Sequence, residues 1–127
     1  MTIALNHTIV YCRNKVATSS YLAEVLGLPA PKPFGPFLVV ELGNGVSLDC
    51  YETDSDIAPQ HYAFLVDDDE FDAIFERLRE RYIQYWADPG QHQSFRINHN
   101  DGGRGTYFED PNGHLLEIIT RPYGSGS

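Results

Sequence analysis

The sequence predicts an α+β fold made of two copies of one strand, helix and strands unit. Segments rich in β-branched and aromatic residues are interrupted by only two helical patterns. The same order of segments occurs twice along the chain. A length of 127 residues suits one domain and leaves little room for a second independent core.

The first unit begins with a strand and a helix. Gly27 closes the helix, and the proline-rich link 28–33 cannot continue it. The Asn44-Gly45 pair predicts a tight hairpin, because that turn needs positive φ angles. The expected elements are a strand at 5–12, a helix at 15–26, and strands at 37–42 and 46–52.

The second unit repeats this order. Its helix is the clearer one, because one apolar stripe runs along it and charged residues occupy the other face. The stripe consists of Phe71, Ile74, Phe75, Leu78 and Tyr82. The acidic run 67–70 supplies caps and negative charge at the helix N-terminus, so it needs no ligand to explain it. The expected strands are 60–66, 104–109 and 114–121.

The repeat indicates a tandem duplication. Module one spans 1–53 and module two spans 59–121 of a single domain, 1–122, and we expect residues 123–127 to form a flexible tail. A unit of this size is too small to bury a sheet face alone. The two modules should therefore pair with each other or with a partner chain.

Charge and composition exclude several classes of partner. Nine Lys and Arg against eighteen Asp and Glu give a net charge of −9, so nucleic acid and anionic membranes are poor partners. No apolar run is long enough to cross a bilayer, and no secretory signal is evident, so we expect a cytoplasmic protein. Cys12 and Cys50 are too few for a disulfide framework. This charge suits a cationic or metal-chelating ligand.

Each module offers one histidine on its first strand and one carboxylate on its last. If the modules pack with pseudo-twofold symmetry, His7, Asp49, His61 and Glu117 converge. Two imidazoles with one or two carboxylates suit a divalent Fe, Mn, Ni, Co or Zn ion. An unpaired carboxylate in an apolar strand costs several kcal/mol, so Glu117 needs a cation, a donor or a proton.

Three segments carry a family resemblance: Leu5-Asn-His7, Gln60-His61-Tyr-Ala-Phe, and residues 105–117, which include Asp-Pro-Asn-Gly-His-Leu-Leu-Glu. They resemble the vicinal oxygen chelate superfamily, which contains glyoxalase I, extradiol dioxygenases, fosfomycin-resistance thiol transferases and bleomycin-binding proteins. The resemblance implies paired βαβββ modules that form a cupped mixed sheet with the helices on its convex face. It also implies a homodimer in which His7 of one chain faces His61 and Glu117 of the other.

The resemblance further implies a metal that chelates two vicinal oxygens of a small substrate. His7, His61 and Glu117 would be the metal ligands. Asp49 is one methylene shorter than the Glu usual in glyoxalase I, and Tyr107 falls where fosfomycin-resistance enzymes keep a pocket tyrosine. Asp49, Tyr107 and Glu117 are thus the candidate catalytic residues.

Arg104 and Tyr11 are candidate substrate contacts. Arg104 lies beside glycines that would suit a mobile edge, although a solvated arginine at a hairpin entry is the simpler interpretation.

The function stays open between a metalloenzyme and a binding protein. As an enzyme, the chain would be a glyoxalase-like lyase or isomerase, a thiol transferase or a dioxygenase. The alternative is a drug-sequestering protein of the bleomycin-resistance type, which the net charge fits and the retained metal ligands do not. A metal that only stabilises the fold is a third interpretation.

Overall fold

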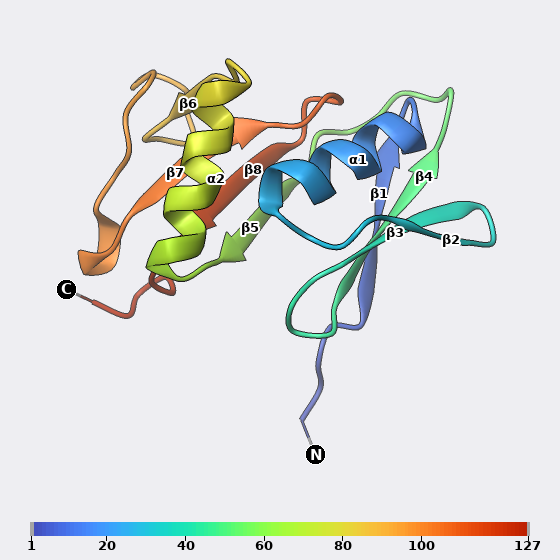
Figure 1. The fold of residues 1–127 in the computed structure, drawn as a ribbon, viewed down its shortest axis with the longest axis horizontal. Helices are drawn as coiled ribbons and strands as arrows, with labels where there is room; N and C mark the ends of the chain where they lie inside the picture. The colour runs from blue at the N-terminus through green and yellow to red at the C-terminus, as the bar shows by residue number, and fades with distance from the viewer. Residues whose placement is uncertain (1, 127) are drawn as a thin grey trace. The chain divides into compact units, whose positions relative to one another are not determined.

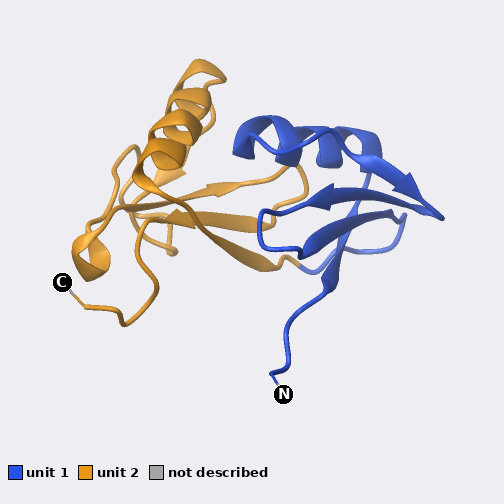
Figure 2. Cartoon of the chain, turned by 60° about the horizontal axis from the view of Figure 1, so that its bottom comes forward, with its two compact units in different colours: residues 1–58 blue, residues 59–127 orange. Residues whose placement is uncertain are grey.

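The computed structural model describes residues 2–126, which form two α-helices, one short 3₁₀ helix and two four-stranded mixed sheets (Figure 1). The chain divides between Ala58 and Pro59 into two compact units (Figure 2). Each unit is a βαβββ module, so the predicted α+β fold class is confirmed.

The first unit forms a sheet in the order β1-β4-β3-β2, in which only the β1–β4 pair is parallel. Its elements are β1 (His7–Cys12), α1 (Lys15–Leu26), β2 (Lys32–Phe34), β3 (Phe37–Glu41) and β4 (Ser47–Glu52). Asn14 caps α1 by accepting a hydrogen bond from the Ala17 amide. Gly27 ends the helix with a φ of 72°, a left-handed conformation that glycine adopts without strain.

The second unit repeats the topology as β5-β8-β7-β6, again with only its first pair, β5–β8, parallel. Its elements are β5 (His61–Leu65), α2 (Asp68–Glu80), β6 (Tyr85–Trp86), the 3₁₀ helix η1 (Asn100–Gly102), β7 (Gly105–Glu109) and β8 (Leu115–Ile119). Identical strand orders and pairings in both units are what a tandem duplication of one module predicts.

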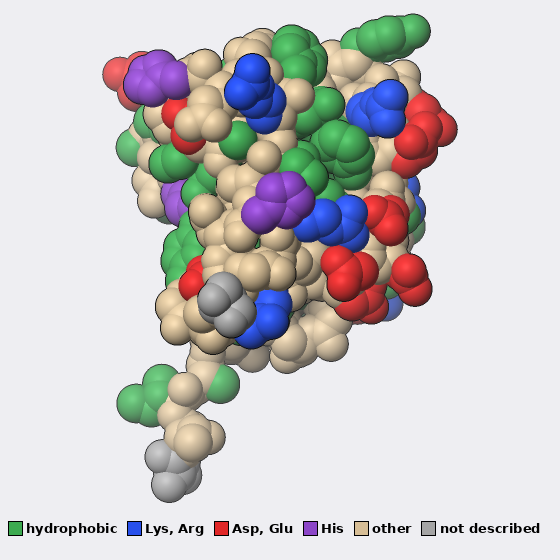
Figure 3. Space-filling view, turned by 90° about the vertical axis from the view of Figure 1, so that its left-hand side faces the viewer, with side chains coloured by type: hydrophobic (Ala, Val, Ile, Leu, Met, Phe, Trp, Pro, Cys, Tyr) green, Lys and Arg blue, Asp and Glu red, His purple; other side chains and the backbone are tan. Residues whose placement is uncertain are grey.

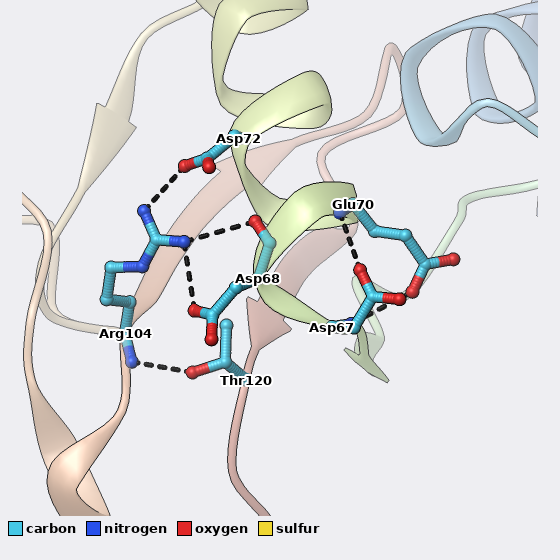
Figure 4. Close-up of polar contacts among 6 residues, drawn as sticks. All are labelled: Asp67, Asp68, Glu70, Asp72, Arg104 and Thr120. Carbon is cyan, nitrogen blue, oxygen red and sulfur yellow. Dashed lines mark hydrogen bonds and ion pairs between the residues drawn. The ribbon is translucent and has the colours of Figure 1, made fainter.

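The acidic start of α2 is a capping box. The Asp67 carboxylate accepts from the Glu70 amide, and the Glu70 carboxylate accepts from the Asp67 amide (Figure 4). The helix ends before Tyr82, which is 96% exposed and has a φ of 56°. The prediction that the apolar stripe reaches Tyr82 is therefore wrong, because the helix ends at Glu80 with Arg81 as its C-cap.

The helix α2 covers one face of the second sheet. In Figures 1 and 2, α2 lies over the sheet of its own unit. Its buried residues are Phe71, Ile74 and Leu78, and the buried strand residues of one sheet face are Thr106, Phe108, Leu116 and Ile118, while Tyr107 and Glu117 are buried on the other. Because side chains alternate along a strand, residues one position away lie on the opposite face.

No helix among the described residues has the length and apolar character that a membrane span requires. On the face drawn in Figure 3, Lys and Arg side chains are scattered among acidic and apolar ones.

Candidate functional site

Glu117 lies in the middle of β8 and is fully buried. Its register partners are Ala63 on β5 and Tyr107 on β7, so a strand flanks it on each side. Strand alternation places the Glu117 side chain on the sheet face opposite the buried Leu116 and Ile118. A carboxylate with this burial requires a partner that compensates for its lost hydration.

The His61 ring lies beside the Glu117 carboxylate. Its Nε2 lies 3.1 Å from Glu117 Oε1, and its Nδ1 lies 3.0 Å from the Leu115 carbonyl oxygen. A carbonyl can only accept, so Nδ1 carries a proton, and in the neutral ring with its one proton there Nε2 presents a lone pair. Two acceptors therefore face each other, and a cation or a proton between them would satisfy both.

The pair fits a divalent cation. Two ligands held at about 2.1 Å from one ion, at near right angles, lie about 3 Å apart, which agrees with the separation between Nε2 and Oε1. Glu117 Oε2 is buried and has no hydrogen-bond partner among residues 2–126. Within that range no group of three or more His, Cys, Asp and Glu side chains is arranged to hold a metal. His61 and Glu117 would thus supply two ligands of a larger set.

Two tyrosines complete the polar cluster around Glu117. The Tyr123 hydroxyl donates to Glu117 Oε1. Tyr107 Oη lies 3.4 Å from Tyr123 Oη, within hydrogen-bond distance. The Tyr107 ring also stacks on the His61 ring, with centroids 6.0 Å apart. These contacts link all four side chains.

Both hydroxyls keep their protons. Burial, followed by the hydrogen bond to Glu117, raises the pKa of Tyr123 far above its ordinary value. Burial also raises the pKa of Tyr107, although the hydrogen bond with Tyr123 opposes this shift. Each tyrosine is therefore a hydrogen-bond donor here and not a phenolate.

The first unit holds His7 and Asp49 at the equivalent register positions. In β1 and β4, His7 pairs with Ser47 and Ile9 pairs with Asp49; in β5 and β8, His61 pairs with Leu115 and Ala63 pairs with Glu117. The two sheets therefore offer the same arrangement of one imidazole and one carboxylate, as the duplication predicted.

The pair of His7 and Asp49 has different hydrogen-bond partners from the pair of His61 and Glu117. Asp49 is 7% exposed, and its Oδ1 accepts from the Ser47 hydroxyl at 2.8 Å. His7 is exposed, and its Nδ1 lies 2.8 Å from the side-chain nitrogen of Asn6. The shorter Asp49 side chain thus has a donor on its own strand.

The candidate substrate contacts lie in different surroundings. Tyr11 shares its strand face with His7, is 47% exposed and packs edge-on against Tyr51 at 5.9 Å. The Arg104 guanidinium contacts α2 instead, 2.7 Å from Asp72 and 3.0 Å from Asp68 (Figure 4). The structure therefore brings His61, Tyr107 and Glu117 together, and it directs Arg104 to the helix.

Sequence reasoning missed Tyr123. It lies in a Gly and Ser segment that was expected to be a tail, and one aromatic residue there shows no periodicity. The only signal was its side chain, an amphipathic group whose hydroxyl needs a partner when it packs.

Comparisons with known proteins agree with this architecture. A family model described as "Glyoxalase/Bleomycin resistance protein/Dioxygenase superfamily" matches residues 4–118. A solved structure named Oxidase ChaP-H2 is 59% identical and has a TM-score of 0.97. The match covers 100% of this chain and 100% of that chain. Oxidase ChaP-H1 is 58% identical, with a TM-score of 0.95 and coverage of 97% of this chain and 99% of that chain.

A more distant relative points to the same fold family. The protein named "Glutathione transferase FosA" from Serratia marcescens is 26% identical over 124 residues, which span 93% of this chain and 81% of that protein. The relatives therefore include proteins named for different chemistries on one scaffold.

Proposed function

The chain belongs to the glyoxalase, bleomycin resistance protein and dioxygenase superfamily, and from this premise we propose that it is a divalent-metal-dependent oxidase. Its substrate would be a small molecule with two adjacent oxygen atoms. Identity of 58% and 59% with two proteins named oxidases favours oxidase chemistry over lyase, isomerase or thiol transferase chemistry.

The observation that carries the proposal is the facing pair of acceptors in the second unit. Glu117 is fully buried, its Oε1 faces the His61 Nε2 lone pair, and its Oε2 has no partner among the described residues. A protein that evolved only to fold would place an apolar residue at this position, since a buried acceptor without a donor costs roughly 1–3 kcal/mol.

We propose that His7 completes the ligand set and that it comes from a second copy of the chain. Two histidines and one carboxylate then bind the ion and leave positions open, which is the donor set typical of non-haem Fe(II) oxygenases. When bound, the metal supplies Lewis acidity and, if it is iron or manganese, electrons for reaction with dioxygen. Zinc has no redox chemistry and does not suit an oxidase.

The protein's own groups would hold the substrate and its proton. The Tyr107 hydroxyl, protonated and part of the Glu117 network, is the proposed proton donor to a substrate oxygen. Tyr11 would contact the substrate through its exposed ring. Asp49, whose Oδ1 accepts from the Ser47 hydroxyl, would assist proton movement.

Metal analysis and dioxygen uptake test the proposal. Protein purified without chelator should contain a stoichiometric first-row metal. Metal-free protein reloaded with Fe(II) should form an adduct with nitric oxide that is visible by electron paramagnetic resonance. Catechol, the simplest aromatic compound with two adjacent oxygens, should perturb that signal by taking the open positions.

Matched variants give the control. Glu117→Gln and His61→Ala should lose the metal, whereas Glu76→Gln, which changes an exposed carboxylate on α2, should keep it. Wild-type protein without metal, or equal dioxygen uptake with zinc and iron, would contradict the proposal. Metal-free protein that binds a cationic glycopeptide tightly would point to drug sequestration instead.

A further inference from the structure

We propose that Tyr123 is a positioning residue for the Glu117 carboxylate, and that Asp101 holds the C-terminal segment that carries Tyr123. This inference rests on the proposed function, because it concerns the ligand role of Glu117. It assigns a role in the site to a segment that follows the last strand and lies outside the duplicated module.

The contact between Tyr123 and Glu117 is directional. The hydroxyl donates to Oε1, the same oxygen that faces His61 Nε2. Tyr107 Oη lies 3.4 Å from Tyr123 Oη, so the two hydroxyls and the carboxylate form one connected group. A carboxylate that accepts from a fixed donor loses rotational freedom, and such partners behind a ligand orient it for the metal.

The Asp101 carboxylate fixes the backbone on both sides of Ser125, two residues after Tyr123. Its Oδ2 accepts from the Gly124 amide at 3.3 Å and its Oδ1 accepts from the Gly126 amide at 3.1 Å. Gly124 and Gly126 have φ angles of 74° and 81°, which glycine adopts readily and other residues rarely do. The Gly and Ser composition that suggested a flexible tail therefore fits a specific turn.

The number of lone-pair positions on the Glu117 carboxylate shows that Tyr123 does not prevent it from binding a cation. An ionised carboxylate has about four lone-pair positions, and one hydroxyl proton occupies one of them. Glu117 Oε2 keeps both of its positions, since it has no partner among the described residues. The contact with Tyr123 thus fixes the carboxylate and still leaves it able to bind a cation.

Cobalt(II) alone, competed against a chelator, is the probe for the test. We expect Tyr123→Phe to weaken cobalt binding about tenfold, which is within the range for the loss of a partner behind a metal ligand. Asp101→Asn should weaken it less, because asparagine tolerates the positive φ of 57° and keeps one acceptor oxygen. Tyr82→Phe removes an exposed hydroxyl from the same module and should change nothing.

Two further readouts separate positioning from a loss of folding. The visible absorption bands of bound cobalt should shift in Tyr123→Phe, while the circular dichroism spectrum of the metal-free variant should remain that of the folded wild type. The double variant, Asp101→Asn with Tyr123→Phe, should bind cobalt as tightly as Tyr123→Phe alone, since Asp101 acts through Tyr123.

The outcomes distinguish this inference from the proposed function. Wild-type protein that binds no cobalt would overturn both. Wild-type protein that binds cobalt, with Tyr123→Phe binding equally or more tightly, would overturn the positioning role alone. Weaker binding on adding Asp101→Asn to Tyr123→Phe would show that Asp101 does not act through Tyr123.

Discussion

At the scale of single residues, Glu117 is a group that is suited to bind a metal and that reduces the stability of the metal-free protein. Without a metal, Glu117 Oε1 and His61 Nε2 lie 3.1 Å apart, and in the neutral ring with its proton on Nδ1 both atoms are acceptors, which is an unfavourable contact. The Tyr123 hydroxyl donates to this carboxylate. Sites built for ligands commonly reduce stability in this way.

We therefore predict that Glu117→Gln stabilises the metal-free protein by about 1 kcal/mol, because the new amide donates to His61 Nε2. Urea unfolding in the presence of a chelator measures this. Added Mn(II) should then raise the unfolding free energy of the wild type and leave that of the variant unchanged. A variant less stable than the wild type without metal would show that the two side chains share a proton instead.

Arg104 is a second residue whose role can be tested, because its guanidinium contacts α2. Its guanidinium pairs with Asp68 and Asp72 and lies 4.4 Å from the centre of the Phe71 ring. We predict that Arg104→Met lowers the unfolding free energy by about 1 kcal/mol, less at high salt, since both aspartates are largely exposed.

The cobalt affinity of Arg104→Met provides the control. It should equal that of the wild type, because Arg104 does not contact Glu117 or His61. An unchanged stability together with weaker binding of an anionic substrate would instead support a substrate contact.

The sequence predicted part of this cluster and could not predict the rest. Strand alternation and the repeat led to His61 and Glu117, because both depend on local periodicity. Tyr123 was missed because its contact depends on a turn held by Asp101, which is more than twenty residues away and carries no pattern.

At the scale of elements, the caps decide where the helices begin and end. Asn14 and Gly27 bound α1, and the Asp67–Glu70 capping box begins α2. These signals are local, so the sequence located the main body of both helices. The short strands β2 and β6 were not expected, because three and two residues are too few to show alternation and they form only by pairing with β3 and β7.

We predict that Asp67→Ala lowers the unfolding free energy by about 1 kcal/mol, because it removes the acceptor for the Glu70 amide. Chemical denaturation followed by circular dichroism measures the loss. Asp67→Asn should retain most of the stability, and Asp69→Ala, which removes a charge from the first turn without a cap bond, should cost less. Equal losses in all three variants would indicate a general charge effect and no specific cap.

At the scale of the whole molecule, the duplication explains why one half looks like a site and the other like its remnant. Both sheets hold a histidine and a carboxylate in the same register. Glu117 Oε2 is buried and has no hydrogen-bond partner among the described residues, whereas Asp49 Oδ1 accepts from Ser47. In the proposed site, the second copy would supply His61 and Glu117, and the first would supply His7.

A mixing experiment tests the proposal that two chains share the site. His7→Ala and Glu117→Gln should each fail to bind cobalt alone. After they exchange subunits, each mixed dimer would have one intact site, so cobalt binding should return to about a quarter of the wild-type amount for random exchange. No recovery, with exchange verified by mass spectrometry, would place all ligands in one chain.

The bonds from Asp101 to the C-terminal glycines also bear on how the protein is best handled in the laboratory. A purification handle fused after these residues would emerge next to Tyr123 and strain the turn that seats it. Residues 2–5 are exposed and precede the first strand, so an N-terminal handle leaves this corner intact. Preparations that differ only in which end carries the handle should accordingly differ in how much metal they retain.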